Sequence, residues 1–400
     1  MWNKLKKWLG RGDASATPAG AAEDPMARAT GVGLQPPRPD LSKQAPRWIE
    51  AADNPWQVRV LDVRPMTLGS LSMSSDPQMA SNAVSYGGET GTSFASEEPS
   101  VDRAVAGSLR FRAPSKIADG ALFIPREMED KWALFVAGGA LIVVRGWQRR
   151  VFLRATLQPQ DGFVDVCQVR GAIWNADEPA EYTLQALDFL LRTHALRQPW
   201  SAPLLHSDSL SPEQLAMQCM SGFGRQASYA YVQAPPRDIP TRPLRTMSAL
   251  HLAAMHNDLA AAHAALASGV PVDQPDPFGA SPLQYVVEPG PLLDLLVDRG
   301  ADVNLAADDG TTPLMAATQN RQPALVNALL ALNAHADDVD VRGFSALHRA
   351  AEMGQADIIN HLLAHGADPD RKAAGEHTPR TLARGRGHEA LLSSAPKRPS

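Results

Sequence analysis

Residues able to carry out chemistry are few in the N-terminal half of this sequence. The most unusual group is a set of arginines: Arg110, Arg126, Arg145, Arg149 and Arg150. Guanidinium groups beside an aromatic wall can bind an anion or a carboxylate, and Trp132 and Trp147 could supply that wall. The alternative, which we favour, places these arginines on a solvated sheet face and a tryptophan in the core.

Nucleophiles and general bases are also sparse. Between residues 48 and 234, His194 and His206 are the only histidines, and Cys167 and Cys219 are the only cysteines of the chain. A histidine–cysteine pair would need the fold to bring distant positions together. No serine-hydrolase elbow, phosphate loop or H-E-x-x-H motif occurs in this region. We expect Cys219 to be a small buried side chain rather than a nucleophile.

In the C-terminal third, His361 and His365 have the i, i+4 spacing of metal ligands on a helix, but no third ligand is evident. The sequence therefore predicts no catalytic, cofactor-binding or metal-binding residues. An enzyme or small-ligand sensor within residues 105–234 is the alternative to a protein that only binds other proteins.

Composition argues against several classes of protein. Acidic residues outnumber basic ones, 43 to 38, so the net charge of −5 gives no basic field for nucleic acid. Two cysteines cannot crosslink a chain of 400 residues, which favours a reducing compartment. No apolar run is long enough to span a membrane, and no secretory signal is evident. We expect a cytoplasmic protein without a nucleic-acid partner.

Residues 1–12 form a short amphipathic segment in which Trp2, Leu5, Trp8 and Leu9 can share one helical face. Such a helix could lie on an anionic membrane surface. The favoured alternative is a frayed basic terminus, because a helix this short is marginal in water. The sequence does not define an oligomeric state.

Domain boundaries follow changes in composition. An Ala- and Pro-rich tail over residues 1–46 is expected to be disordered. Residues 47–234 predict an α+β domain with a long loop at 66–100. Prolines within residues 235–245 predict a stiff linker, and residues 246–395 form the last region.

The α+β domain is expected to be a β-meander with two helices. Gly138-Gly139 should join two of its strands as a two-residue hairpin. A helix is expected from Asp177 to Ala195, and Ser211 opens a second helix with a capping box. The segment MEDKWALFVAGGALIVVRGWQRRVF resembles uncharacterised bacterial domains, and that resemblance implies no known activity.

The C-terminal region is a tandem repeat. Five units begin with a hydroxyl residue, at intervals of 33, 31, 33 and 33 residues: Ser248, Ser281, Thr312, Ser345 and Thr378. The clearest copy, SALHRAAEMGQADIINHLLAHGADPD, predicts helix, turn, helix and extended loop. The period and the T-P-L-H-x-A and L-L-x-x-G-A-D patterns resemble the ankyrin-repeat family over about residues 247–392. The resemblance implies an all-α solenoid of four repeats plus a partial C-terminal cap. The second repeat, interrupted by Pro289 and Pro291, should have a short inner helix.

The resemblance implies structural roles for His251 and His348, which hold the turn in this family, and places binding on the loop tips and inner helices. The tip residues are Asp276, Phe278, Asp308, Asp309, Asp340 and Arg342. The inner-helix residues are Met255, His256, Tyr285, Arg349 and Glu352. We predict a protein–protein interaction adaptor with an unidentified protein partner, and Phe278 as an anchor. Acidic tips favour a basic partner, although aspartate is also common in such turns.

Overall fold

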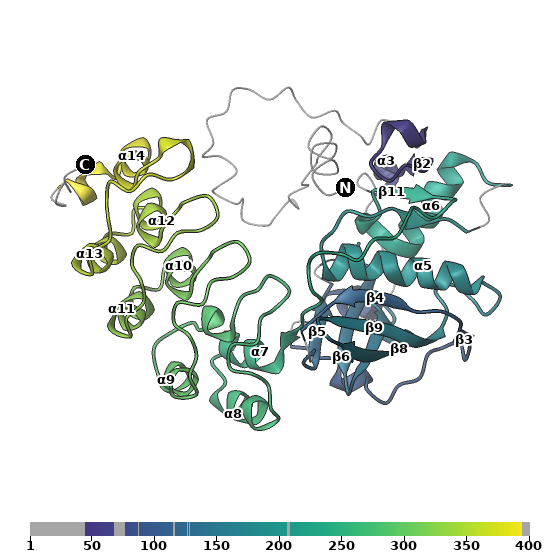
Figure 1. Ribbon diagram of the computed structural model, residues 1–400, viewed down its shortest axis with the longest axis horizontal. Helices are drawn as coiled ribbons and strands as arrows, with labels where there is room; N and C mark the ends of the chain where they lie inside the picture. Colours follow the sequence, from purple (N-terminus) through teal and green to yellow (C-terminus); the bar gives the residue numbers. More distant parts are fainter. Residues whose placement is uncertain are drawn as a thin grey trace. The chain divides into compact units, whose positions relative to one another are not determined.

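The computed structural model describes residues 45–67, 77–86, 88–114, 117–125, 127, 129–205 and 209–393. It divides the chain into two compact units (Figure 1). The N-terminal unit comprises Met1–Lys116 and Leu122–Leu244, and the C-terminal unit comprises Ile117–Ala121 and Arg245–Ser400. The predicted fold class, an α+β region followed by helical repeats, is confirmed. Residues 1–12, considered above as a membrane anchor, lie outside the described residues.

A largely antiparallel sheet organises the N-terminal unit. Its strands in spatial order are β5 (Gly120–Phe123), β6 (Trp132–Ala137), β7 (Ala140–Arg145), β8 (Arg150–Gln160), β9 (Phe163–Gly171) and β3 (Ala104–Val105), with β4 (Leu109–Arg112) also paired to β9. The hairpin prediction is confirmed, because Ala137 pairs with Ala140 across the two turn glycines. Both glycines have positive φ, 57° and 75°, which the tight turn requires.

The core of this unit lies where the pleat buries apolar residues. In β4, Leu109 and Phe111 are buried while Arg110 and Arg112 are exposed. The central strand β6 is buried on both faces. Helix α5 (Ala180–Leu190) crosses one face of the sheet (Figure 1). The helix expected up to Ala195 continues beyond α5 as a π-helical turn, Leu191–Ala195.

A second, smaller sheet completes the N-terminal unit. Its order is β1 (Arg47–Ile49), β2 (Val60–Asp62), β11 (Tyr229–Tyr231) and β10 (Ala202–Pro203). Two further helices are α3 (Arg64–Thr67) and α6 (Pro212–Phe223). The capping box predicted at Ser211 is present, because its side chain accepts from Gln214 N while the Gln214 side chain accepts from Ser211 N.

The segment interpreted as a long loop at 66–100 contains ordered elements within its described part. These are α4 (Pro77–Val84) and a 3₁₀ turn, Thr92–Phe94. The rings of Tyr86 and Phe94 stack on Phe135 of β6, with centroids 6.1 and 5.7 Å away. Because these contacts join residues far apart in sequence, local periodicity does not reveal them.

The proline-rich segment before the repeats lies against the N-terminal unit. Arg192, which is almost fully buried, donates to the Asp238 carboxylate (2.9 Å) and to the Asp238 carbonyl oxygen. Leu244 N donates to Arg112 O at 2.7 Å, and the Leu244 side chain is buried. Tertiary contacts, in addition to proline stiffness, therefore fix residues 235–244.

The C-terminal unit is a stack of helix pairs in two rows (Figure 1). The inner row contains α7 (Ala249–Met255), the 3₁₀ turn Pro282–Tyr285, α10 (Pro313–Gln319), α12 (Ala346–Glu352) and α14 (Pro379–Gly385). The outer row contains α8 (Leu259–Ala267), α9 (Pro291–Asp298), α11 (Pro323–Ala331), α13 (Ala356–Ala364) and the 3₁₀ turn Glu389–Leu392. Leucine, isoleucine and alanine side chains between the rows form one continuous core. Within the described residues, no helix has both the length and the apolar character needed to cross a bilayer.

The first repeat incorporates a short piece of chain from far upstream. Strand β12 (Met247–Ser248) pairs antiparallel with Ala121 and Gly120. The Thr246 hydroxyl, which is buried, donates to Ala118 O at 2.8 Å. A side chain on Gly120 would place its Cβ 2.3 Å from Met247 O, so this pairing requires glycine.

Candidate functional site

Each repeat begins with a cap that fixes the start of its inner helix. In the fourth repeat, Ser345 N donates to His348 Nδ1 (3.1 Å), so that nitrogen is unprotonated and the proton resides on Nε2. His348 Nε2 then donates to Arg371 O in the next repeat, at 3.0 Å. Burial lowers the pKa of His348, which keeps the ring neutral. His251 repeats this arrangement with Ser248 and Ala280, so both histidines are structural.

Glutamine performs the same task in the second repeat, where histidine is missing. In the second repeat the Gln284 amide oxygen accepts from Ser281 N (3.0 Å), while its nitrogen donates to Thr311 O (2.5 Å). A primary amide carries an acceptor and a donor, as a neutral imidazole does, so glutamine fits this position. The short inner helix expected in this repeat is confirmed as the four-residue 3₁₀ turn Pro282–Tyr285.

The loop tips are held by buried carboxylates. Asp340 Oδ1 accepts from Arg342 N and Phe344 N, both at 2.9 Å. Asp276 Oδ1 accepts from Phe278 N (2.7 Å) and Ala280 N (2.8 Å) in the first tip. Both aspartates are buried. Their carboxylates therefore fix the loops and are not presented at the surface.

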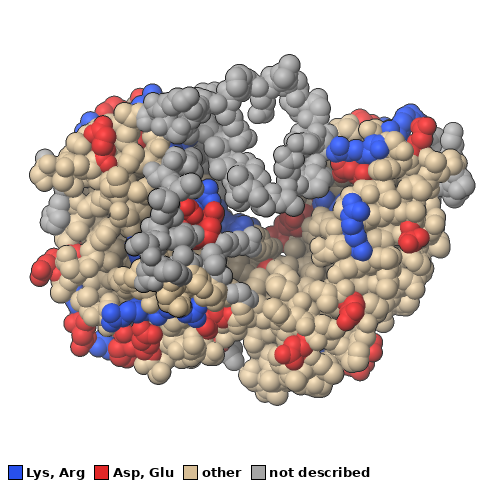
Figure 2. All heavy atoms as spheres, turned by 180° about the vertical axis from the view of Figure 1, so that it is seen from behind, with Lys and Arg blue, Asp and Glu red and all other residues tan. Residues whose placement is uncertain are grey.

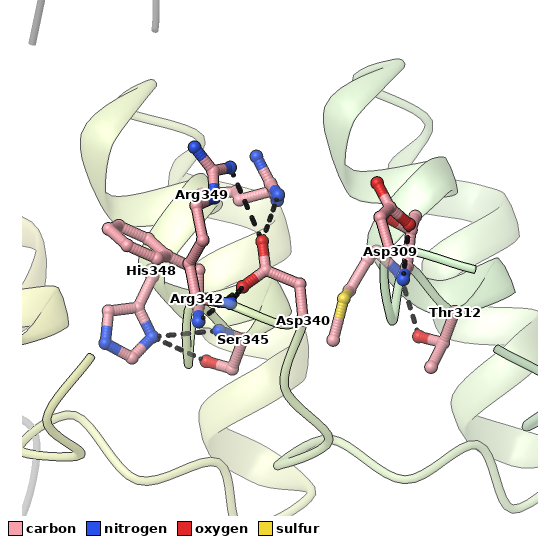
Figure 3. A network of polar contacts seen from close by, with 10 residues as sticks. Asp309, Thr312, Asp340, Arg342, Ser345, His348 and Arg349 are labelled. Carbon is pink, nitrogen blue, oxygen red and sulfur yellow. Dashed lines mark hydrogen bonds and ion pairs between the residues drawn. The ribbon is translucent and has the colours of Figure 1, made fainter. Parts of the chain in front are cut away.

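Side chains of the inner row complete these two carboxylate sites. Arg349 of α12 donates to Asp340 Oδ2 at 2.7 Å, with both side chains almost fully buried (Figure 3). Tyr285 donates its hydroxyl to Asp276 Oδ2 at 2.6 Å. Burial lowers the pKa of Arg349, and the Asp340 carboxylate opposes that shift. Arg349 was predicted from the sequence to contact a partner protein. In the structure its side chain is buried and stabilises the loop of its own repeat.

Backbone hydrogen bonds connect successive tips into a ladder. Asp308 N donates to Phe278 O, Val341 N to Asp309 O, and Ala374 N to Arg342 O, at 2.8–2.9 Å. Phe278 is half-buried. The Asp308 carboxylate accepts from Arg245 at 2.8 Å. Asp309 is exposed, and its Oδ1 accepts from Thr311 N (Figure 3).

The other inner-row candidates differ in exposure. Met255 and His256 are exposed at the end of α7, and Tyr285 is half-buried. Glu352 accepts from Arg386 at 2.8 Å and is mostly covered. The predicted residues therefore divide into scaffold groups and a smaller exposed set: Met255, His256, Asp309 and Arg342.

Sequence reasoning missed Val341, which lies between two predicted tip residues. Its surface is 74% exposed, more than that of any other large apolar side chain in the described residues. The sequence around Val341 does not distinguish it from other valines in loops. Its exposure depends on the turn that Asp340 holds and on the stacking of the repeats.

Charges on the array do not form a single-sign surface. On the face of the array shown in Figure 2, acidic and basic side chains are interspersed. Of the four tip aspartates, two are buried in the loops and one is bonded to Arg245. Most of the tip carboxylates that the sequence suggested as an acidic surface therefore have hydrogen-bond or ion-pair partners within the array.

The described arginines and tryptophans of this cluster make contacts within the N-terminal unit. Arg145 donates to Ser221 O (2.5 Å) and Gly222 O (2.8 Å) and lies over the Trp132 ring. Burial lowers the pKa of Arg145 to about 10. Arg110 pairs with Asp165, and Arg149 contacts Glu89 and the Tyr86 ring. Arg126 lies outside the described residues.

Among the described candidates of this unit, no hydrogen bond joins His194 to Cys167 or Cys219. Cys219 is buried, and that burial raises its pKa to about 12. His194 is buried among aromatic rings, including Phe123 at 4.7 Å, and burial lowers its pKa to about 3. Cys167 lies on β9, where burial raises its pKa. His206 lies outside the described residues.

Comparison with known proteins identifies the repeats. The family model described as ankyrin repeats, in three copies, matches residues 250–342 and, overlapping, 290–373. Neurogenic locus notch homolog protein 1 of Xenopus tropicalis is 38% identical over 141 residues, covering 34% of this chain and 6% of that protein. The human protein of that name is 34% identical over 139 residues, covering 34% of this chain and 5% of its own length. The chain thus spans only about a twentieth of these relatives. Residues 250–373 are ankyrin repeats.

Proposed function

We propose that this protein is an interaction adaptor whose ankyrin array binds a protein partner through its loop tips and inner row. The observation that carries the proposal is the division of the tip residues into two sets. Buried groups such as Asp340 and Arg349 hold the loops rigidly, and exposed groups such as Asp309 and Arg342 are displayed from them. A rigid surface loses little conformational entropy on binding.

The exposed set has the composition expected of a recognition surface. Met255 and His256 lie at one end of the inner row, and Asp309 and Arg342 lie on successive tips. Methionine and arginine are both enriched in protein interfaces. A cytoplasmic location belongs to the same proposal, and fractionation of the source cells tests it.

Co-purification with quantitative mass spectrometry tests the binding face. The intact chain is compared with a variant carrying Met255→Ser, His256→Ser and Arg342→Ala. A matched control carries His263→Ser and Asn360→Ser, which change exposed residues of the outer helices α8 and α13. Partners should be lost from the first variant and kept by the control. Equal recovery from all three proteins would contradict the proposed face.

A further inference from the structure

The single exposed valine of the tips is held in a fixed position. Asp340 N donates to Phe344 O and Gly343 N donates to Asp340 O, which closes the turn around Val341. The amide of Val341 is bonded in turn to Asp309 O of the preceding tip, at 2.9 Å. The Val341 side chain is 74% exposed on a turn whose backbone is fixed, so contact with a partner would order little backbone.

Opposite charges flank this valine. Asp309, on the preceding tip, is exposed. Arg342 follows Val341 directly, and its side chain is 49% exposed although it lies 3.4 Å from the Asp340 carboxylate. That carboxylate is buried and is also bonded to Arg349, so it neutralises Arg342 only in part. Along the two successive tips, Asp309, Val341 and Arg342 therefore follow one another, and each has an exposed side chain.

From this order we infer the chemistry of the partner, an inference that rests on the proposed function of the array. The partner is a protein segment that places an apolar side chain on Val341, a lysine or arginine toward Asp309, and an aspartate or glutamate toward Arg342. The tip aspartates alone suggested a partner with basic character, and the exposed Arg342 adds the requirement for an acidic residue. Charge complementarity selects the direction in which the segment lies across the tips.

Burial of the valine provides the attraction, and the two charges provide the selection. Covering a valine side chain contributes about 1.5–3 kcal/mol, which corresponds to roughly tenfold or more in affinity. Exposed charge pairs contribute less, roughly fivefold or less in affinity each. Removing Val341 should therefore weaken binding, whereas changing Asp309 should alter which segments bind.

A library of random linear peptides displayed on phage is the probe, and the full-length protein is the bait. Parallel selections use the wild type, Val341→Ser, Asp309→Lys and the control Asn360→Ser on outer helix α13. Urea unfolding confirms that each bait is folded. Peptides selected on the wild type should combine an apolar residue with a basic and an acidic flank. Binding should fall at least about tenfold on Val341→Ser, and Asp309→Lys should select an acidic residue where the wild type selects a basic one.

Three results would overturn the inference: no enriched peptide, equal binding to Val341→Ser, or an unchanged charge preference on Asp309→Lys. A further bait, Met255→Ser with His256→Ser, separates this inference from the proposed function. If peptides are lost on that bait alone, the array is the binding face but Val341 is not its anchor. If no array variant alters binding, the peptides recognise another surface. That result would contradict both the proposed function of the array and the inferred role of Val341.

Discussion

The Asp340 carboxylate lies 2.7 Å from the Arg349 guanidinium, and both side chains are almost fully buried. The same carboxylate accepts two loop amides, so it joins the tip to the inner helix of its own repeat. Asp276 does the same in the first tip, with the Tyr285 hydroxyl as its partner. The proposed recognition is therefore left to the side chains that these contacts do not use.

Replacing Asp340 with alanine should destabilise the array by about 3 kcal/mol, because Arg349 would keep a buried charge without its partner. Two loop amides would also lose their acceptor. Urea unfolding followed by circular dichroism measures the change. The matched control is Asp309→Ala, which removes an exposed carboxylate of the neighbouring tip and its hydrogen bond from Thr311 N, and it should destabilise the array by about 1 kcal/mol or less. Similar losses in the two variants would show that the buried pair has no special role.

Sequence reasoning predicted the repeat scaffold because that scaffold is local and periodic. The caps at Ser345 and Ser281, the shortened second repeat and the hairpin at Gly138-Gly139 all follow from short-range chemistry. The different roles of the tip aspartates could not be predicted in this way, because Asp309 and Asp340 are the same residue type in similar loop sequences. Asp340 begins its loop, where its own amide bonds to Phe344 O, whereas the equivalent position in the preceding loop is Ala307. A shift of two positions therefore separates a buried support from an exposed charge.

Long-range contacts were the other part that local patterns could not reveal. The stacking of Tyr86 on Phe135 and the pairing of Gly120 with Ser248 join residues distant in sequence. The binding of Asp238 by Arg192 is of the same kind. Each contact depends on tertiary packing, which composition and periodicity do not predict.

Acidification should weaken the fold. Burial lowers the folded-state pKa of His194, His251 and His348 below the ordinary histidine value of about 6.5. Each neutral ring therefore contributes stability that is complete above pH ~6.5 and is lost as pH falls toward the folded-state pKa. The urea midpoint should be lower at pH 5 than at pH 7.5. This decrease adds to any change caused by the carboxylates. A midpoint that rises on acidification would contradict this assignment.

His348→Gln isolates one of these contributions. Glutamine already holds the equivalent turn at Gln284, so the variant should keep most of its stability at pH 7.5. It cannot gain a proton, so its urea midpoint should decrease less between pH 7.5 and pH 5 than that of the wild type. An identical pH dependence in the two proteins would show that His348 does not carry the effect.

Gly120→Ala should destabilise the C-terminal unit. The new Cβ would lie 2.3 Å from Met247 O, at a residue whose φ is +150°, so the β12 pairing would have to shift. We expect a loss of about 3 kcal/mol from clash and backbone strain together. Gly138→Ala is the control, because it also has positive φ but meets no atom within 4 Å. It should cost about 1 kcal/mol. Urea unfolding that shows no difference between the variants would argue against a role for Gly120 in the array.

Arg192→Met should release the segment at residues 235–244. Arg192 bonds to Asp188 and to Asp238, and it lies 4.1 Å from the centre of the Trp200 ring. Losing it leaves the buried Asp188 carboxylate without its nearest cation and frees the segment. Limited trypsin digestion should cut after Arg237 faster in the variant. Glu181→Gln, an exposed change on α5, should leave the cutting rate unaltered. Equal rates for Arg192→Met and the wild type would contradict the proposed restraint.

Hydrogen exchange in the presence of a co-purified partner tests the binding face most directly. Amide exchange is followed by mass spectrometry across the full chain, with and without the partner. We predict slower exchange at tip residues 277–278, 308–309 and 341–342 and along the inner row, with the outer helices α8, α11 and α13 unchanged. Protection confined to the outer helices or to the N-terminal unit, with the tips unchanged, would contradict it.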